Sequence, residues 1–363
     1  MKVLFITRAT LFNDQGGDTI QALETAKHLE KLHIQADVKL TNEIIDYSGY
    51  DLIHFFNIIR PAAILKHISK TDKPYVVSTI FVDYSEFETK ARTGMARFLF
   101  SLFNADQIEY LKAMARWFKN GEAPGSFRYL WWGHKKSVRH VIRHSRALLP
   151  NSESEYKRLV AHYAVQHNYY TIPNAINQQL FIRPGENLNR DEQMVICVGR
   201  IEGRKNQLNL IRAVKGTAYS LKIIGAGASN QKGYLKLCKE EAGSNVEFIN
   251  SMPQHDLIHI YSKAKVHVLA SWFETTGLSS LEAGVMGCNL VITDKGDTRE
   301  YFGQDVWYCD PASPESILSA IQAASVAPVN NLLIKRINTL YTWENAAVKT
   351  RDAYDQILSD KDT

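Results

Sequence analysis

Residues 270–284 read Ala-Ser-Trp-Phe-Glu-Thr-Thr-Gly-Leu-Ser-Ser-Leu-Glu-Ala-Gly, and this stretch decides the fold. The apolar run 266–270 predicts a buried strand, and residues 278–286 predict a helix. Between them, Gly277 lets the backbone come close to a ligand. A strand end beside a helix start leaves N–H groups unpaired at the positive end of the helix dipole, which attracts anions.

Two carboxylates, Glu274 and Glu282, lie in this stretch. A carboxylate accepts two hydrogen bonds from a vicinal diol, so acids beside an anion site suit a ligand that carries sugar hydroxyls as well as phosphates. We expect one acid on a ribose and the other on a hexose. The spacing alone favours equally a capped surface helix with two solvated acids.

The Glu-x7-Glu spacing, within Gly-Leu-x-x-Leu-Glu-Ala-Gly, resembles the signature of retaining family 4 glycosyltransferases. The resemblance implies an α/β GT-B fold, in which two Rossmann-like domains with parallel sheets face each other across a cleft. It extends over nearly the whole chain and is strongest over residues 195–300.

The chain has 363 residues, more than one hydrophobic core usually spans, which predicts two domains. We expect an acceptor-side domain over residues 1–182, with a basic helical insertion at about 85–146 and a final helix at about 345–363 packing back on it. Residues 183–344 would form the nucleotide-sugar-binding domain. No window has transmembrane length and the first apolar run is too short for a signal peptide, so we expect a cytoplasmic protein, soluble or peripheral at the inner membrane face.

A second set of predicted donor contacts opens the second domain. A strand ends at Arg200, and Lys205 stands just before a helix, so both cations can converge on one diphosphate. This resembles the Gly-Arg…Lys-Gly clamp of the family, with Asn206 in place of the glycine. The alternative is a pair of surface cations on a loop.

The remaining site residues come from glycine loops and from the resemblance. Gly16-Gly17 follow the first strand, although a tight turn explains them as well, and Gly225 ends a strand. The predicted donor-binding residues are Gly16, Gly17, Arg200, Lys205, Gly225, Thr275, Thr276, Gly277, Leu278 and Glu282. The predicted catalytic residues are Glu274, Arg200, Lys205 and Asp83.

Asp83 is predicted because this chain departs from the family. Many relatives carry a histidine where this chain has Phe81, and Asp83 lies just beyond it. A carboxylate there can orient or deprotonate the acceptor hydroxyl. A helix N-cap is the equal alternative for Asp83.

The charge is concentrated in one segment. Residues 90–146 hold twelve Lys or Arg and three Asp or Glu, a net charge of +9, whereas the whole chain carries +5. Aromatic residues lie among these cations, a pattern that suits an anionic membrane surface. An ordinary helical insertion is the main alternative, and nucleic acid is a distant third that we do not expect as a partner.

Together these observations predict a retaining, metal-independent hexosyltransferase without a cofactor, acting in surface polysaccharide or glycolipid synthesis. The donor would be a UDP- or GDP-sugar, and the acceptor a hydroxyl of a glycan or lipid-linked saccharide. The four cysteines lack metal-ligand spacing, and no Asp-x-Asp marks a metal site. Two alternatives remain open: a nucleotide-sugar epimerase on the same fold, and a non-catalytic membrane- or nucleic-acid-binding protein on a degenerate scaffold.

Overall fold

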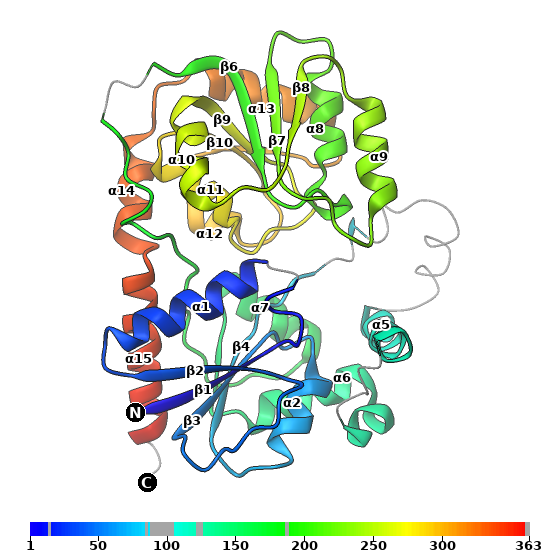
Figure 1. The fold of residues 1–363 in the computed structure, drawn as a ribbon, viewed down its shortest axis with the longest axis vertical. Coiled ribbons are helices and arrows are strands. Elements are labelled where there is room, and N and C mark those ends of the chain that lie inside the picture. Colours follow the sequence, from blue (N-terminus) through cyan, green and yellow to red (C-terminus); the bar gives the residue numbers. More distant parts are fainter. Residues whose placement is uncertain (14–15, 84–85, 88–104, 121–125, 186–188, 360–363) are drawn as a thin grey trace. The chain divides into compact units, whose positions relative to one another are not determined.

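The computed structural model describes residues 1–363 apart from 14–15, 84–85, 88–104, 121–125, 186–188 and 360–363. The chain forms two compact units, each built on one parallel sheet (Figure 1). The first unit comprises Met1–Phe81, Arg92–Asn174 and Trp343–Thr363, and the second comprises Val82–Ala91 and Ala175–Thr342. The predicted α/β class with two parallel sheets is confirmed.

The first unit has a five-stranded sheet in the order β2-β1-β3-β4-β5. Its strands are β1 (Lys2–Thr7), β2 (Gln35–Leu40), β3 (Leu52–Phe56), β4 (Tyr75–Ser78) and β5 (Ala147–Leu149). Its described helices are α1 (Gly17–Glu30), α2 (Pro61–Ile68), α5 (Ala105–Asn120), α6 (Phe127–His144), α7 (Glu153–Tyr163) and α15 (Trp343–Ser359).

The C-terminal helix α15 is attached to the first sheet by a buried polar chain. His54 of β3 makes a 2.6 Å hydrogen bond with the Tyr354 hydroxyl of α15 and a 2.8 Å bond with the Ser78 hydroxyl of β4. Burial lowers the pKa of His54 to about 3, so the ring is neutral at physiological pH. Figure 1 shows α15 running beside α1, which it contacts.

The second unit has a six-stranded sheet in the order β11-β10-β9-β6-β7-β8. Its strands are β6 (Asp191–Val198), β7 (Ser220–Ile224), β8 (Val246–Ile249), β9 (Ala264–Leu269), β10 (Asn289–Thr293) and β11 (Trp307–Cys309). Its helical elements are η1 (Gly203–Lys205, a 3-10 turn), α8 (Gln207–Val214), α9 (Lys232–Glu241), α10 (Gln254–Lys263), α11 (Leu278–Val285), α12 (Thr298–Phe302), α13 (Pro314–Val326) and α14 (Asn331–Leu340).

The strand order brings several loops to one edge of the second sheet. Strands β10, β9, β6 and β7 are consecutive neighbours, and all of their pairings are parallel. Parallel strands have their carboxyl ends at the same edge, which is where open α/β sheets bind ligands. The loops after these four strands therefore meet there, and most of the predicted site residues lie in them.

Candidate functional site

An ion pair joins two of the predicted catalytic residues. Lys205 Nζ lies 2.5 Å from Glu274 Oε1, so the loop after β6 is tied to the loop after β9. The Glu274 side chain is 7% exposed and that of Lys205 is 26% exposed. A carboxylate so deeply buried needs a cationic or hydrogen-bonding partner, and Lys205 provides both. Their roles in catalysis stay predictions.

Asn206 explains how Lys205 is held. Its backbone is left-handed, with φ of 57°, a conformation that glycine adopts freely and asparagine tolerates better than most residues. Its buried amide donates to the carbonyls of Ala270, at 3.0 Å, and Pro311, at 2.7 Å. Asparagine therefore serves where the family has glycine, and its side chain also joins this turn to the end of β9.

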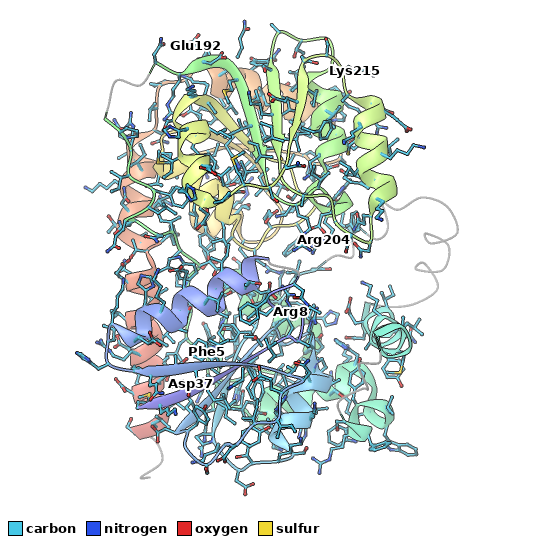
Figure 2. The ribbon with its side chains drawn as sticks, viewed as in Figure 1. Phe5, Arg8, Asp37, Glu192, Arg204 and Lys215 are labelled. Carbon is cyan, nitrogen blue, oxygen red and sulfur yellow. The ribbon has the colours of Figure 1, made fainter. Side chains whose placement is uncertain are left out.

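The other residues of the β6 turn lie close to the ion pair in sequence. Arg200 is half-buried just after β6, and its carbonyl accepts a 2.9 Å bond from Gln207 Nε2 at the start of α8. Arg204, labelled in Figure 2, lies in η1 and pairs with Glu202 at 2.6 Å. Arg200 and Lys205 thus lie in the one turn that follows β6, and their convergence on a diphosphate stays a prediction.

Two glycines at this edge allow loops to approach each other closely. A Cβ on Gly296 would lie 2.0 Å from the carbonyl oxygen of Glu274, and a Cβ on Gly225 would lie 2.0 Å from that of Gly199. Their φ values, 87° and 154°, also disfavour other residues. Gly225 was predicted from its strand-end position, whereas Gly296 was missed as a site residue. The sequence marks Gly296 only as a glycine shortly after an apolar run, the run that forms β10.

The loop after β9 leads into α11 as the sequence predicted. Gly277 has φ of 72° and forms the N-cap of α11, and no side chain caps this helix start in the described structure. Thr276 is buried, while Thr275 and Leu278 are half-buried. The first N–H groups of a helix have no partner within it, so this terminus can bind an anion.

Glu282 lies on α11 and contacts α10. One carboxylate oxygen accepts a 2.7 Å bond from Gln254 Nε2, and the other accepts a 2.9 Å bond from the Tyr261 hydroxyl. Burial raises the pKa of Glu282 to about 7, although both hydrogen bonds oppose this shift. Each oxygen keeps a second lone pair, so the predicted contact with a diol is chemically open. Tyr261 was missed because no local pattern marks it.

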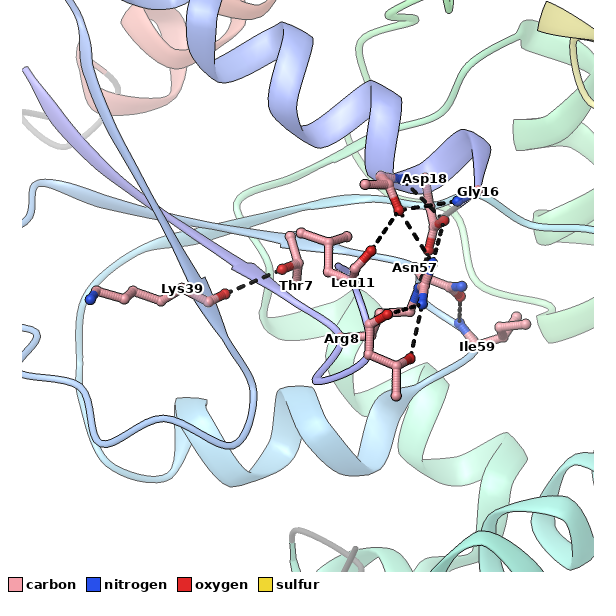
Figure 3. A network of polar contacts seen from close by, with 10 residues as sticks. Thr7, Arg8, Leu11, Gly16, Asp18, Lys39, Asn57 and Ile59 are labelled. Atoms are coloured by element: carbon pink, nitrogen blue, oxygen red, sulfur yellow. Dashed lines mark hydrogen bonds and ion pairs between the residues drawn. The ribbon is translucent and has the colours of Figure 1, made fainter. Parts of the chain in front are cut away.

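In the first unit, an arginine network surrounds the start of α1 (Figure 3). Gly16 is the N-cap, and Gly17 is the first helical residue. Arg8 donates from Nε to one oxygen of Asp18, at 2.6 Å, and from a terminal nitrogen to the other, at 3.0 Å. Burial raises the pKa of Asp18, but hydrogen bonds and charge from Arg8, with the charge of Arg60, outweigh it and hold the pKa below its ordinary value. Sequence reasoning missed Arg8, whose only signal is a cation after the first strand.

The loop after β4 is held by a buried glutamate. Glu155 of α7 accepts a 2.7 Å bond from the Phe81 N–H and a further bond from the Thr79 hydroxyl. Its other oxygen accepts from the Asn151 N–H at 2.9 Å. Phe81 is buried, whereas Asp83 is exposed two residues later. Asp83 therefore stays a candidate, and Glu155 is a residue that the sequence marked only as part of a helix start.

Within the part of the chain that the structure describes, no group of three or more His, Cys, Asp or Glu side chains is arranged to hold a metal ion. No single described helix is long and apolar enough to cross a membrane. Helices α13 and α14 pass that test only together, as a pair bent by 100°.

Comparisons with known proteins bear on the second unit most strongly. The family model described as "Glycosyl transferases group 1" matches residues 178–328. An uncharacterized glycosyltransferase of Methanocaldococcus jannaschii is 29% identical over 177 residues, 45% of each chain. D-inositol 3-phosphate glycosyltransferase of Mycobacterium ulcerans is 25% identical over 61% of this chain and 52% of its own length. The chain thus matches about half the length of these curated relatives.

Solved structures resemble the chain over nearly its full length. Sucrose-phosphate synthase from Thermosynechococcus elongatus has a TM-score of 0.77 at 16% identity, covering 99% of this chain and 100% of its own. HepE of Anabaena, solved with UDP and glucose, has a TM-score of 0.69 at 14% identity, covering 98% and 99%. These likenesses establish the GT-B fold. The family model thus places residues 178–328 among the glycosyl transferases group 1, and the whole chain has the GT-B fold of these solved structures.

Proposed function

We propose that this protein transfers a hexosyl group from a nucleoside diphosphate sugar to a hydroxyl of a glycan or lipid-linked saccharide, with retention at the anomeric carbon and without a metal ion. The observation that carries the proposal is the Lys205–Glu274 pair beside the uncapped start of α11. A cation and free N–H groups suit a diphosphate, and a buried carboxylate suits sugar hydroxyls.

The chemistry requires stabilisation of negative charge on the departing diphosphate. Arg200, Lys205 and the N–H groups around Leu278 would supply it. Glu274 would orient the hexose through its hydroxyls, and Glu282 would bind the ribose. The acceptor hydroxyl attacks the anomeric carbon on the face from which the diphosphate leaves. The glycosidic bond to the diphosphate breaks, and a phosphate oxygen takes up the acceptor proton.

The identity of the substrates draws on proteins that resemble this chain. HepE of Anabaena was solved with UDP-glucose, which favours a UDP-sugar over a GDP-sugar as the donor. A relative of Campylobacter jejuni, 26% identical over 161 residues, is named for transfer to a diphospho-undecaprenol-linked saccharide. A lipid-linked acceptor would put the reaction at the cytoplasmic face of the membrane, in surface polysaccharide or glycolipid synthesis.

A thermal-shift screen against UDP, GDP, ADP and their common sugars tests the donor. We expect one nucleotide sugar to raise the melting temperature of the wild-type protein, and Glu282→Ala and Lys205→Ala to lose this shift. Lys222→Ala is the matched control, because Lys222 pairs with Glu247 on the second sheet away from the site loops. If no nucleotide stabilises the protein, or if both variants keep the shift, the proposal for the donor site is wrong.

Product analysis separates transfer from epimerisation. Incubated with the donor alone, an epimerase converts the sugar of the nucleotide, whereas a transferase needs an acceptor. We expect product only when a glycan or lipid-linked saccharide is added. Asp83→Asn tests whether this carboxylate orients the acceptor hydroxyl for attack: we expect slower turnover with unchanged donor binding, and unchanged turnover would make Asp83 structural.

A further inference from the structure

Helix α6 has one face in the core of the first unit and another toward solvent. Its buried side chains are Tyr129, His134, Ser137, Val138, Val141 and Ile142. Several of them join the hydrophobic cluster that contains the strand residues Val77 and Leu148. Gly133, with φ of 69° and ψ of −176°, breaks α6 into two pieces, and each piece is anchored by buried side chains, Tyr129 before the break and the others after it.

The piece before Gly133 carries two large aromatic side chains that are exposed to solvent. Phe127 is 90% exposed and Trp131 is 89% exposed. They are four positions apart, one turn along the helix, so their side chains are neighbours. On the adjacent helix α5, Leu111 is also exposed. Neighbouring exposed apolar side chains of this size mark a binding surface more often than an ordinary soluble surface.

Exposed cations lie in both pieces of α6. Arg128, Lys136 and Arg143 are exposed, and the sequence of α6 contains no acidic residue. Lys136 Nζ lies 5.7 Å from the ring centroid of Trp132 and the Arg128 guanidinium lies 6.0 Å from it, so the cations and aromatic rings are interleaved.

Two other cations of α6 serve the first unit itself. Arg139 donates to the Tyr163 carbonyl at 2.7 Å, and Lys135 Nζ lies 3.9 Å from Asp106. Neutralising them would disturb internal contacts as well as the surface. The exposed side chains that can be changed without touching the core, which we call the outward face of α6, are Phe127, Arg128, Trp131, Lys136 and Arg143.

We propose that this outward face of α6 docks the protein on an anionic lipid bilayer. The rings of Phe127 and Trp131 enter the interface, and Arg128, Lys136 and Arg143 bind headgroup phosphates. The exposed residues of α6 are apolar, cationic or, at His144, an imidazole, and none of them is acidic. The exposed Leu111 of α5 is aliphatic and offers no ring on which a base could stack, which favours a bilayer over nucleic acid. The proposal does not rest on the donor site.

Vesicle co-sedimentation of the full chain, without any nucleotide, tests the proposal. We expect the protein to pellet with vesicles of phosphatidylcholine and phosphatidylglycerol and not with phosphatidylcholine alone. Phe127→Ser/Trp131→Ser and Lys136→Gln/Arg143→Gln should each weaken this binding about tenfold or more. Added salt should weaken it further.

Matched controls come from elsewhere on the surface. Leu332→Ser on α14 removes an apolar side chain that is 71% exposed, and Lys232→Gln/Lys236→Gln removes two exposed cations of α9. Both controls should bind as the wild type does. All variants should melt at the wild-type temperature, because the changed side chains are exposed.

Brominated lipids test insertion directly. We expect them to quench part of the tryptophan fluorescence of the wild-type protein, and Trp131→Phe to bind normally while losing part of that quenching. Equal binding to both vesicle types, or equal loss in the control variants, would overturn the proposal. So would tighter binding to duplex DNA or RNA than to vesicles, lost in the same α6 variants, because nucleic acid would then be the partner.

Discussion

The Nζ atom of Lys205 and the Oε1 atom of Glu274 are 2.5 Å apart, although the residues stand in different loops of the second unit. Each was predicted to bind the donor, Lys205 through a phosphate and Glu274 through a hydroxyl. In the structure each is the partner of the other. A donor that binds here must therefore replace or share this ion pair. Without a donor, each charged side chain holds the other in place.

Removing one member of the pair should be worse than neutralising both. Lys205→Met leaves a buried carboxylate without its cation, which should cost about 1–3 kcal/mol of stability. Lys205→Met/Glu274→Gln keeps the shapes and removes both charges, so it should recover most of that loss. Urea unfolding followed by circular dichroism measures both. A double variant less stable than the single one would show that the two residues do not act as a pair.

Glu282 should make the unliganded protein less stable as pH rises. Its pKa is raised to about 7 from an ordinary value of 4.5, so the folded state holds a proton that the unfolded state releases. Its contribution is full below pH 4.5 and is lost as pH rises to about 7, which is worth about 3 kcal/mol. Glu282→Gln should remove this fall. Melting temperatures across this pH range, compared with wild type, measure it.

Donor affinity should change in the opposite direction with pH. The proposed ribose contact needs the carboxylate, so binding should strengthen as pH rises through about 7 and Glu282 ionises. Glu282→Gln should bind more weakly at high pH and show a flatter pH profile. Titration calorimetry of the nucleotide at several pH values measures this. Affinity that falls with rising pH in the wild type would contradict the ribose role.

The positions of the site loops could be predicted because their signals are local. The apolar run before Ala270 predicts a strand. Gly277 after it predicts a loop that leads into a helix. Gly225 likewise follows its strand directly. Such patterns depend on burial and backbone conformation within a few residues, which the sequence displays.

The polar partners could not be predicted because they come from distant elements. Glu282 is bound by Gln254 and Tyr261 of α10. Ser152 and Glu155 have the spacing of a helix cap, and the Glu155 N–H does donate to the Ser152 hydroxyl at 2.9 Å. Yet the carboxylate of Glu155 binds the loop after β4 instead. Only the packing of α7 on the sheet brings the Glu155 carboxylate to that loop, and no local sequence pattern indicates this packing.

Gly296 should be essential for the position of Glu274. Gly296→Ala puts a Cβ against the Glu274 carbonyl and strains a φ of 87°, so we expect a loss of about 2–4 kcal/mol and weaker donor binding. Gly216→Ala is the control, since its φ is 74° but nothing lies within 4 Å of the added Cβ. It should cost about 1 kcal/mol and leave binding unchanged. If the two changes affected nucleotide binding equally, Gly296 would have no specific role in the donor site.

Loss of the Asn206 side-chain amide should destabilise the protein more than strain in the Asn206 backbone does. Asn206→Gly keeps the left-handed turn and loses only the two bonds to Ala270 and Pro311, at about 1–3 kcal/mol. Asn206→Ala adds about 1 kcal/mol of backbone strain. Asn206→Asp should be the least stable at neutral pH, because a buried carboxylate would face two carbonyl oxygens that need a donor.

The aspartate variant also gives this prediction a pH signature. Burial against two acceptors favours the protonated acid, which can donate one hydrogen bond, so the pKa of the new carboxyl should rise. Stability should then be highest at low pH and fall as pH rises through that pKa, whereas the glycine and alanine variants show no such additional fall. Melting temperatures at several pH values compare the three. If Asn206→Asp matched Asn206→Gly at every pH, the amide donor would not be what joins the Lys205 turn to the end of β9.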